Sequence, residues 1–208
     1  MRYILGVVLF WSSWIKADTA TVDENMWSWG VAFPIEVTYI SQKNGERAYY
    51  FPYWGVASFD TYIGYSDFEL HLDWAKIDFR SDSLKNYSEY VGQTYGASLF
   101  YTLTRRVQAG VYMDKLSFIS TSSSSYDKAT LKGYGLKFIY NPNRVKEYNE
   151  KRTIQMYYTL AIGYVDGKES TSVSSDYKYI NYRVQRVRTE THPDLSGKSV
   201  SLGVMLKY

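Results

Sequence analysis

The sequence predicts an all-β protein: a closed, antiparallel, up-and-down transmembrane β-barrel of eight strands, with ten strands as the alternative. Three observations support this fold class. Large apolar residues alternate with small or polar ones over most of the chain, which is the period of a strand with two different faces. The small or polar face is rich in Gly, Ala, Ser and Thr, as a narrow barrel interior requires. Aromatic residues make up 18% of the chain, including 23 Tyr, which suits a surface that meets both hydrocarbon and water.

Length, charge and cysteine content restrict the class of protein. The 208 residues correspond to about one domain. Lys and Arg number 24 against 21 Asp and Glu, and the net charge of +3 argues against a nucleic-acid partner. No apolar run of about 18 residues follows the N-terminus, which excludes a bundle of membrane-spanning helices. The absence of cysteine excludes disulfides and cysteine nucleophiles, and we expect a monomer with no cofactor and no bound metal.

Residues 1–17 have the pattern of an export signal. Arg2 gives a positive start, and the apolar stretch from Ile4 to Ile15 is long enough for a signal peptide but too short for a spanning helix. We expect cleavage after Ala17, followed by a polar periplasmic segment over residues 18–26. The alternative interpretation is a buried N-terminal helix or strand.

The clearest strand runs from Trp27 to Tyr39, with large apolar residues at odd positions and smaller or polar residues at even positions. Pro34 interrupts it, because proline cannot donate a ladder hydrogen bond, and we expect a bulge there. One more strand lies between Tyr49 and Tyr62, but both of its faces are apolar and the pattern does not assign its phase. The other alternating segments, which complete the set of eight, are 68–74, 91–103, 107–114, 133–140, 154–164 and 199–208.

The character of the two faces favours a membrane barrel over a soluble sandwich. In a sandwich, the face opposite the apolar one would be rich in Lys, Glu and Thr. Here that face is small, with few charges. This distribution fits a barrel whose exterior meets lipid and whose narrow interior is filled with small and paired polar side chains. Closure of the sheet also satisfies every backbone hydrogen bond, as hydrocarbon demands.

Connections in such a barrel alternate between short periplasmic turns and longer external loops. An exported chain starts in the periplasm, so the first strand runs outward. External loops are then expected near 41–48, 82–89, 120–128 and 166–198, and periplasmic turns near 63–66, 104–106 and 141–152. Two aromatic girdles are expected at the interfaces: Trp27, Trp29, Tyr101, Tyr140 and Tyr208 on the periplasmic side, and Tyr39, Trp74, Tyr95 and Tyr164 on the outer side.

The segment from Trp27 to Tyr208 resembles the small eight-stranded outer-membrane β-barrel proteins of Gram-negative bacteria. Its most specific element is the final strand, Val200 to Tyr208, in which alternating apolar residues lead to a terminal aromatic residue. This ending resembles the signal that the outer-membrane barrel assembly machinery recognises. The resemblance implies an integral outer-membrane protein with external loops and periplasmic termini. Such a protein contacts outer-membrane lipid and lipopolysaccharide and is assembled by that machinery through the strand ending at Tyr208.

Charged residues on the interior face form the first candidate site. They are Glu36, Glu69, His71, Asp73, Asp114 and Lys137. Gln155 and Lys207 are expected on the same interior face. Charges buried in a narrow interior must be paired, so we favour a polar plug that closes the barrel. The alternative is a narrow path for cations, because acids predominate. His71 lies two residues from both Glu69 and Asp73, which makes a metal site conceivable, but a structural histidine bound to an acid is favoured.

Two further groups of residues lie in the last expected loop. The segment 177–188 reads as an extended strand with four cations, and its arginines have the geometry to bind lipopolysaccharide phosphates; these candidate contacts are Lys178, Arg183, Arg186 and Arg188. Alternatives are a solvated hairpin without a ligand, or an additional pair of spanning strands. His192, Asp194 and Ser196 are residue types used by barrel enzymes that modify lipid A, although their spacing here does not match a motif of those enzymes.

The leading expectation is a non-enzymatic integral outer-membrane barrel whose exposed loops serve surface interaction, adhesion or envelope integrity. A narrow pore for small solutes or ions is the second candidate. An enzyme that modifies lipid A is the third. The fold class alone does not choose among them, because function depends on the site that a fold carries.

Overall fold

The computed structural model describes residues 27–52, 58–82, 84, 90–121, 125–142, 154–180 and 182–208. The expected signal peptide and the segment 18–26 lie outside these ranges. Within them, no helix is long and apolar enough to cross a membrane.

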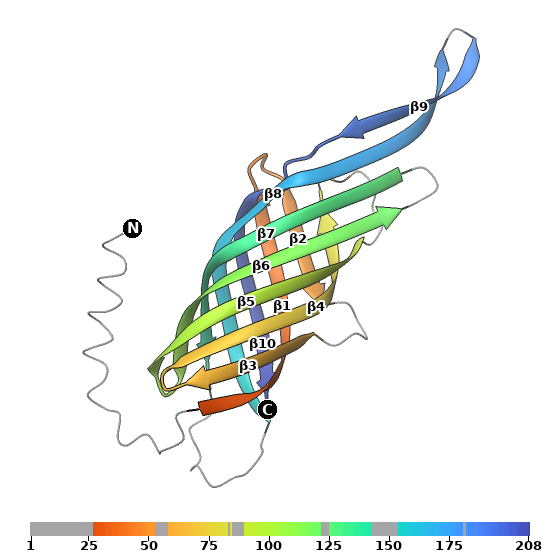
Figure 1. Cartoon of the computed structure of the whole chain (residues 1–208). Coiled ribbons are helices and arrows are strands. Elements are labelled where there is room, and N and C mark those ends of the chain that lie inside the picture. Colours follow the sequence, from red (N-terminus) through yellow and green to blue (C-terminus); the bar gives the residue numbers. More distant parts are fainter. Residues whose placement is uncertain are drawn as a thin grey trace.

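The described chain is all-β, and every strand pairs with its neighbours in antiparallel orientation (Figure 1). The strands are β1 (Trp27–Gln42), β2 (Arg47–Pro52), β3 (Phe59–Tyr65), β4 (Phe68–Ser81), β5 (Tyr90–Thr104), β6 (Val107–Thr121), β7 (Ser125–Tyr140), β8 (Gln155–Ile180), β9 (Arg183–Thr191) and β10 (Gly197–Lys207). We call the end that carries the β8–β9 hairpin the upper end, and the end where the C-terminus lies the lower end.

The sheet closes into a ring of eight strands. β2 and β3 both pair with β1 and β4, so together they occupy one position in the ring. β4 to β8 follow in chain order, and β10 pairs with both β8 and β1 to complete the circuit. Among the described residues, β9 pairs with β8 alone and stands outside the ring. The all-β, up-and-down prediction with eight strands is confirmed, and the alternative of ten ring strands is wrong.

Pro34 lies in β1 beside the interruption between β2 and β3. β1 pairs with β3 up to Ala32 and with β2 from Thr38 onwards, so the two paired stretches do not meet. On that side, the Pro34 carbonyl oxygen accepts a hydrogen bond from the Ser58 hydroxyl. The N–H and C=O of one residue in an antiparallel strand point to the same neighbour. The missing N–H of Pro34 therefore removes no ladder bond, and β1 keeps its register with β10 through Pro34 without the expected bulge.

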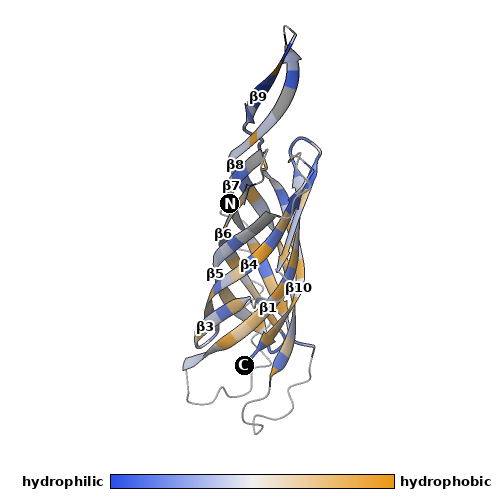
Figure 2. Ribbon diagram, turned by 90° about the vertical axis from the view of Figure 1, so that its right-hand side faces the viewer, coloured by the Kyte–Doolittle hydropathy of each residue, from blue (hydrophilic) through white to orange (hydrophobic). Residues whose placement is uncertain are grey.

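The apolar face of each ring strand points outward. Trp29 is 83% exposed and Leu99 is 48% exposed, whereas the small residues Ser98 and Ser201, which alternate with apolar ones, are buried. Figure 2 shows hydrophobic residues over the lower and middle parts of the ring and hydrophilic residues over its upper end and the β8–β9 hairpin.

The two faces exchange character towards the upper end. On β4, the exterior positions change from Leu72 and Trp74 to Lys76, while the interior positions change from His71 to the buried Ile77. The interior of the upper end is filled by a buried apolar cluster, which we call the upper apolar cluster: Ile40, Ala48, Ala75, Ile77, Phe79, Leu84, Leu116, Phe118, Ala129, Leu131, Val165 and Leu195. The sequence predicted a small and polar interior throughout. The upper end differs because its apolar residues keep the period of two but occupy the opposite face.

Two segments expected as loops are largely strand. β6 continues through Thr121 and β7 begins at Ser125, so most of 120–128 is paired. Most of 166–198 is the β8–β9 hairpin, in which Ser172 pairs with Thr191 and Ile180 with Arg183. Their serines and threonines suggest loops by composition, yet they extend ladders that begin lower in the ring. The expected loop 41–48 is a tight turn, with Gly45 at a φ of 85°, and the expected loop 82–89 lies mostly outside the described residues.

Candidate functional site

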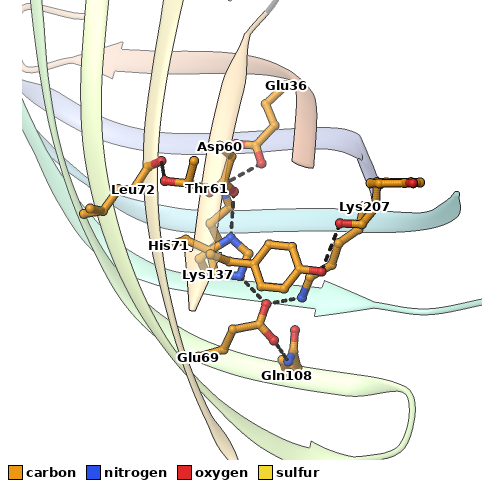
Figure 3. A network of polar contacts seen from close by, with 11 residues as sticks. Glu36, Asp60, Thr61, Glu69, His71, Leu72, Gln108, Lys137 and Lys207 are labelled. Carbon is orange, nitrogen blue, oxygen red and sulfur yellow. Dashed lines mark hydrogen bonds and ion pairs between the residues drawn. The ribbon is translucent and has the colours of Figure 1, made fainter. Parts of the chain in front are cut away.

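The lower half of the ring interior holds a cluster of charged side chains that come from four strands (Figure 3). We call Asp60, Glu69, His71, Gln108 and Lys207 the lower polar cluster. His71 lies at its centre: Nδ1 is 2.6 Å from Asp60 Oδ2 and Nε2 is 2.6 Å from Glu69 Oε1. His71 packs edge-on against the Phe100 ring at 5.0 Å and is almost fully buried.

The two contacts of His71 decide what the imidazole can do. Ionised carboxylates only accept hydrogen bonds, and an imidazole donates from both nitrogens only when it is protonated. The geometry therefore fits an imidazolium between two carboxylates, which offsets the cost of burying those charges. Both ring nitrogens are used, so none remains for a metal. Among the described residues, no group of three His, Cys, Asp or Glu side chains could hold a metal ion.

Lys207 connects the last strand to this cluster. Its ammonium forms an ion pair with Glu69 and lies 3.9 Å from the centroid of the Tyr62 ring. The Tyr62 hydroxyl donates to the Tyr208 carbonyl oxygen at 3.2 Å, and Gln108 Nε2 donates to Glu69 Oε2 at 3.0 Å. These contacts fix the lower end of β10 to β3, β4 and β6.

A second group of charges lies higher in the interior, and we call Glu36, Tyr50, Asp73, Asp114 and Lys137 the upper polar cluster. Lys137 Nζ lies 2.7 Å from Glu36 Oε1. The Tyr50 hydroxyl donates to Asp114 Oδ2 at 3.2 Å. All five side chains line a cavity of about 70 Å³. Three carboxylates face one ammonium here, so the positive charge of Lys137 is the main electrostatic compensation in this part of the ring.

Glycines make room for the acids of the upper polar cluster. A Cβ atom at Gly96 would collide with the Asp73 carboxylate, and one at Gly133 would collide with Asp114. Small interior residues are therefore required opposite bulky ones, as in other narrow barrel interiors. On β7, the space left at Gly133 is occupied by the Asp114 side chain of the adjacent strand β6.

The upper apolar cluster follows directly above the cavity. On β4 the interior sequence continues from Asp73 to Ile77 and Phe79, and on β6 it continues from Asp114 to Leu116 and Phe118. The rings of Phe79 and Phe118 stack with their centroids 4.4 Å apart. The described interior therefore has a charged lower part and a mainly apolar upper part, although Asp127 is a buried acidic residue near the upper end of β7.

His192, Asp194 and Ser196 lie near one another in sequence but contact different partners. Ser196 is fully buried; its hydroxyl accepts from the Gly167 N–H at 2.9 Å and donates to Asp166 at 3.3 Å. His192 is exposed, and its ring lies 3.2 Å from the Ser170 carbonyl oxygen. Hydrogen bonding to Ser196, whose backbone N–H donates to Asp194 Oδ1 at 2.9 Å, holds the pKa of the Asp194 carboxyl below its usual range. These contacts explain the three residues as a folded connection, without assembling a nucleophile and a base.

The four basic residues of the second candidate site lie on the β8–β9 hairpin. Lys178, Arg183, Arg186 and Arg188 are all exposed, and Figures 1 and 2 show the hairpin projecting beyond the upper end of the ring. The hairpin is a two-stranded ribbon whose β9 edge has no further strand partner among the described residues. The cations are thus held away from the apolar exterior of the ring.

Sequence reasoning missed several members of the interior clusters. Asp60 and Tyr62 lie in the segment whose phase was not assigned, although reading backwards from the outward Tyr65 of β3 places both inside. Gln108 is uncharged and lies at the start of the predicted strand 107–114, so the pattern of interior charges does not single it out. Gln155, which was expected inside, is exposed at the lower end, where it accepts a hydrogen bond from the Tyr157 hydroxyl at 2.6 Å.

No family model matches the chain, and no curated protein matches it either. Three features of the molecule bear on its function: the exposed apolar exterior, the layered interior and the projecting hairpin.

Proposed function

We propose that the protein is a non-enzymatic, integral outer-membrane β-barrel that presents the β8–β9 hairpin outside the cell as an interaction element. The observation that carries this proposal is the distribution of side chains over the lower and middle parts of the ring. Large apolar residues cover the exterior while charged residues fill the interior. In water, such an exterior would leave a large apolar patch exposed. In a bilayer, the same exterior is solvated by lipid tails, and ring closure satisfies the backbone.

The proposal assigns an orientation and two boundaries. Exposed aromatic residues at the lower end, including Trp27 and Tyr208, mark the periplasmic interface, where strand ends and the C-terminus meet. Tyr39, Tyr95 and Tyr134 mark the outer interface. Above them, the exterior becomes polar and the interior apolar, which is the pattern of a water-exposed β-structure. The final strand would present the assembly machinery with alternating apolar residues that end at Tyr208.

Surface interaction is favoured over the other two functions because of how the interior closes. The upper apolar cluster lies between the 70 Å³ cavity and the upper end of the ring, and dry apolar layers oppose the passage of ions. The hairpin offers an exposed edge and four cations to a partner. The role of the hairpin in adhesion or envelope integrity is part of the same proposal.

The pore alternative predicts a different result in a planar bilayer. We expect no unitary conductance steps from the purified, inserted protein, because the upper apolar cluster excludes water from the interior. The same conductance measurement is made on the Phe79→Gly, Phe118→Gly double variant, in which the loss of both rings opens the upper apolar cluster. Steps seen with the unaltered protein would support a pore and contradict the closed interior.

Membrane insertion is tested by two matched arginine substitutions. Leu99 is 48% exposed on the middle of β5, and Ile119 is 55% exposed on the upper part of β6. Leu99→Arg should lower the free energy of unfolding by about 2–4 kcal/mol, because its charge would enter the hydrocarbon. Ile119→Arg should change it by less than about 0.5 kcal/mol, as for a site in water. Urea unfolding of the protein in floated lipid vesicles measures both, and equal small effects would mean that the middle of the ring does not face lipid.

A further inference from the structure

Two lysines lie side by side on the exterior of the ring just above the outer aromatic residues. Lys115 of β6 and Lys132 of β7 are directly opposite each other in the ladder, and both are exposed. We propose that this lysine pair binds the phosphate of an anionic lipid in the external leaflet. The proposal rests on the membrane location proposed above and adds a lipid class and a site to it.

The two lysines of the pair repel each other. Like charges at directly opposed positions of neighbouring strands destabilise a sheet. Lys132 is partly compensated, because its Nζ lies 3.1 Å from Glu169 Oε1. Lys115 has no ion pair with any described residue. A phosphate bound between the two ammonium groups would compensate both, and a lysine ammonium binds phosphate through charge and up to three hydrogen bonds.

The lysine pair lies at about the level of the outer aromatic residues. Lys115 is opposite Tyr95 of β5, and Lys132 lies two residues above Tyr134 on β7. Both tyrosines are exposed on the exterior. Exposed aromatic side chains of this kind lie at the level of lipid headgroups, and long lysine side chains extend further towards the headgroups. The two ammonium groups are therefore at the depth where lipid phosphates lie.

The cations of the hairpin are too far from that level to share the site. Arg186 pairs with Tyr177 of β8, and Tyr177 follows Tyr164 of the outer interface by roughly 40 Å of extended strand. Even with the tilt usual in small barrels, this places Arg186 well outside the headgroup layer. The hairpin cations are therefore not part of the site that the lysine pair forms.

The experiment compares two double variants of the inserted full chain. Native mass spectrometry would count phosphatidylglycerol, lipopolysaccharide or phosphatidylcholine retained by the protein, with inorganic phosphate as a competitor. Lys115→Gln with Lys132→Gln should reduce the affinity for both anionic lipids by about fivefold per lysine, and leave phosphatidylcholine unchanged. The matched control, Lys43→Gln with Lys128→Gln, removes two exposed lysines that belong to neither candidate site, and it should retain these lipids as the unaltered protein does. If inorganic phosphate binds the site more strongly than either anionic lipid does, the site binds free anions, and the lipid assignment is overturned.

A stability measurement separates binding from a structural role. In phosphatidylcholine vesicles, Lys115→Gln should leave the urea midpoint unchanged or raise it, because it removes repulsion. In vesicles that contain phosphatidylglycerol, the same change should lower the midpoint, because the shared phosphate loses a partner. A parent protein that floats with both vesicles but shows no preference for anionic lipid would overturn this inference and leave the proposed membrane location intact. Failure to float at all would contradict the proposed function itself.

Discussion

Lys137→Met is expected to lower the free energy of unfolding by about 3–5 kcal/mol, because it removes one partner of a buried ion pair. Lys137 Nζ lies 2.7 Å from Glu36, and the same cavity is lined by Asp73 and Asp114. Methionine fills a similar volume without the charge, so the loss reports electrostatics rather than packing. The three carboxylates would then share a narrow interior with no ammonium of their own cluster. Urea unfolding in lipid vesicles measures the change.

Two further variants test the cause of that loss. Lys43→Met alters an exposed lysine in the β1–β2 turn and should change the free energy by less than about 0.5 kcal/mol. Adding Glu36→Gln to Lys137→Met removes the carboxylate that lost its partner, and part of the stability should return. A Lys137→Met protein as stable as the Lys43→Met protein would mean that water, rather than Lys137, compensates the interior acids.

Phe79→Ala is expected to cost about 3–5 kcal/mol, the usual range for truncating a phenylalanine in a packed core. Phe79 is 0% exposed and stacks on Phe118 within the upper apolar cluster. The matched control is Phe68→Ala, on the same strand but 52% exposed at the lower end. Phe68 would face lipid, so its truncation should forfeit mainly its ring contact with Tyr101, about 0.5–1.5 kcal/mol.

The comparison of the two phenylalanines is read in vesicles by urea unfolding. A larger cost at Phe79 means that the upper interior is a packed core. If Phe79→Ala costs no more than Phe68→Ala, water or loosely packed side chains occupy the upper interior, and a pore becomes the better interpretation.

The sequence predicted the parts of the fold in which one period of two runs without interruption. β1 is the clearest example, because its exterior and interior residues differ in both size and polarity. The same logic places Glu36 and Lys137 inside, and the structure brings them together. The alternation of apolar and polar residues could not reveal which acidic residue would contact Lys137, because that choice depends on the register between strands that are far apart in sequence.

The remaining features failed to appear in the sequence for identifiable physical reasons. The segment that became β2 and β3 is apolar on both faces, so alternation carries no phase there, and Asp60 was missed. The upper apolar cluster keeps the period of two but exchanges the faces, so a single assignment of outward-facing apolar residues cannot hold along a whole strand. The exchange from Trp74 to Lys76 on β4 marks that point once the register is known.

The seam between β1 and β10 has a consequence for how the molecule is made. It joins the first and last described strands, and its side-chain hydrogen bond between Thr38 and Ser201 spans 163 positions of sequence. Closing so long a loop costs more entropy than forming the hairpins between neighbouring strands, which can zip locally. The seam therefore closes last. Until Lys207 reaches Glu69, both strands of the seam keep unpaired edges, and this open-edged precursor is the species most exposed to aggregation.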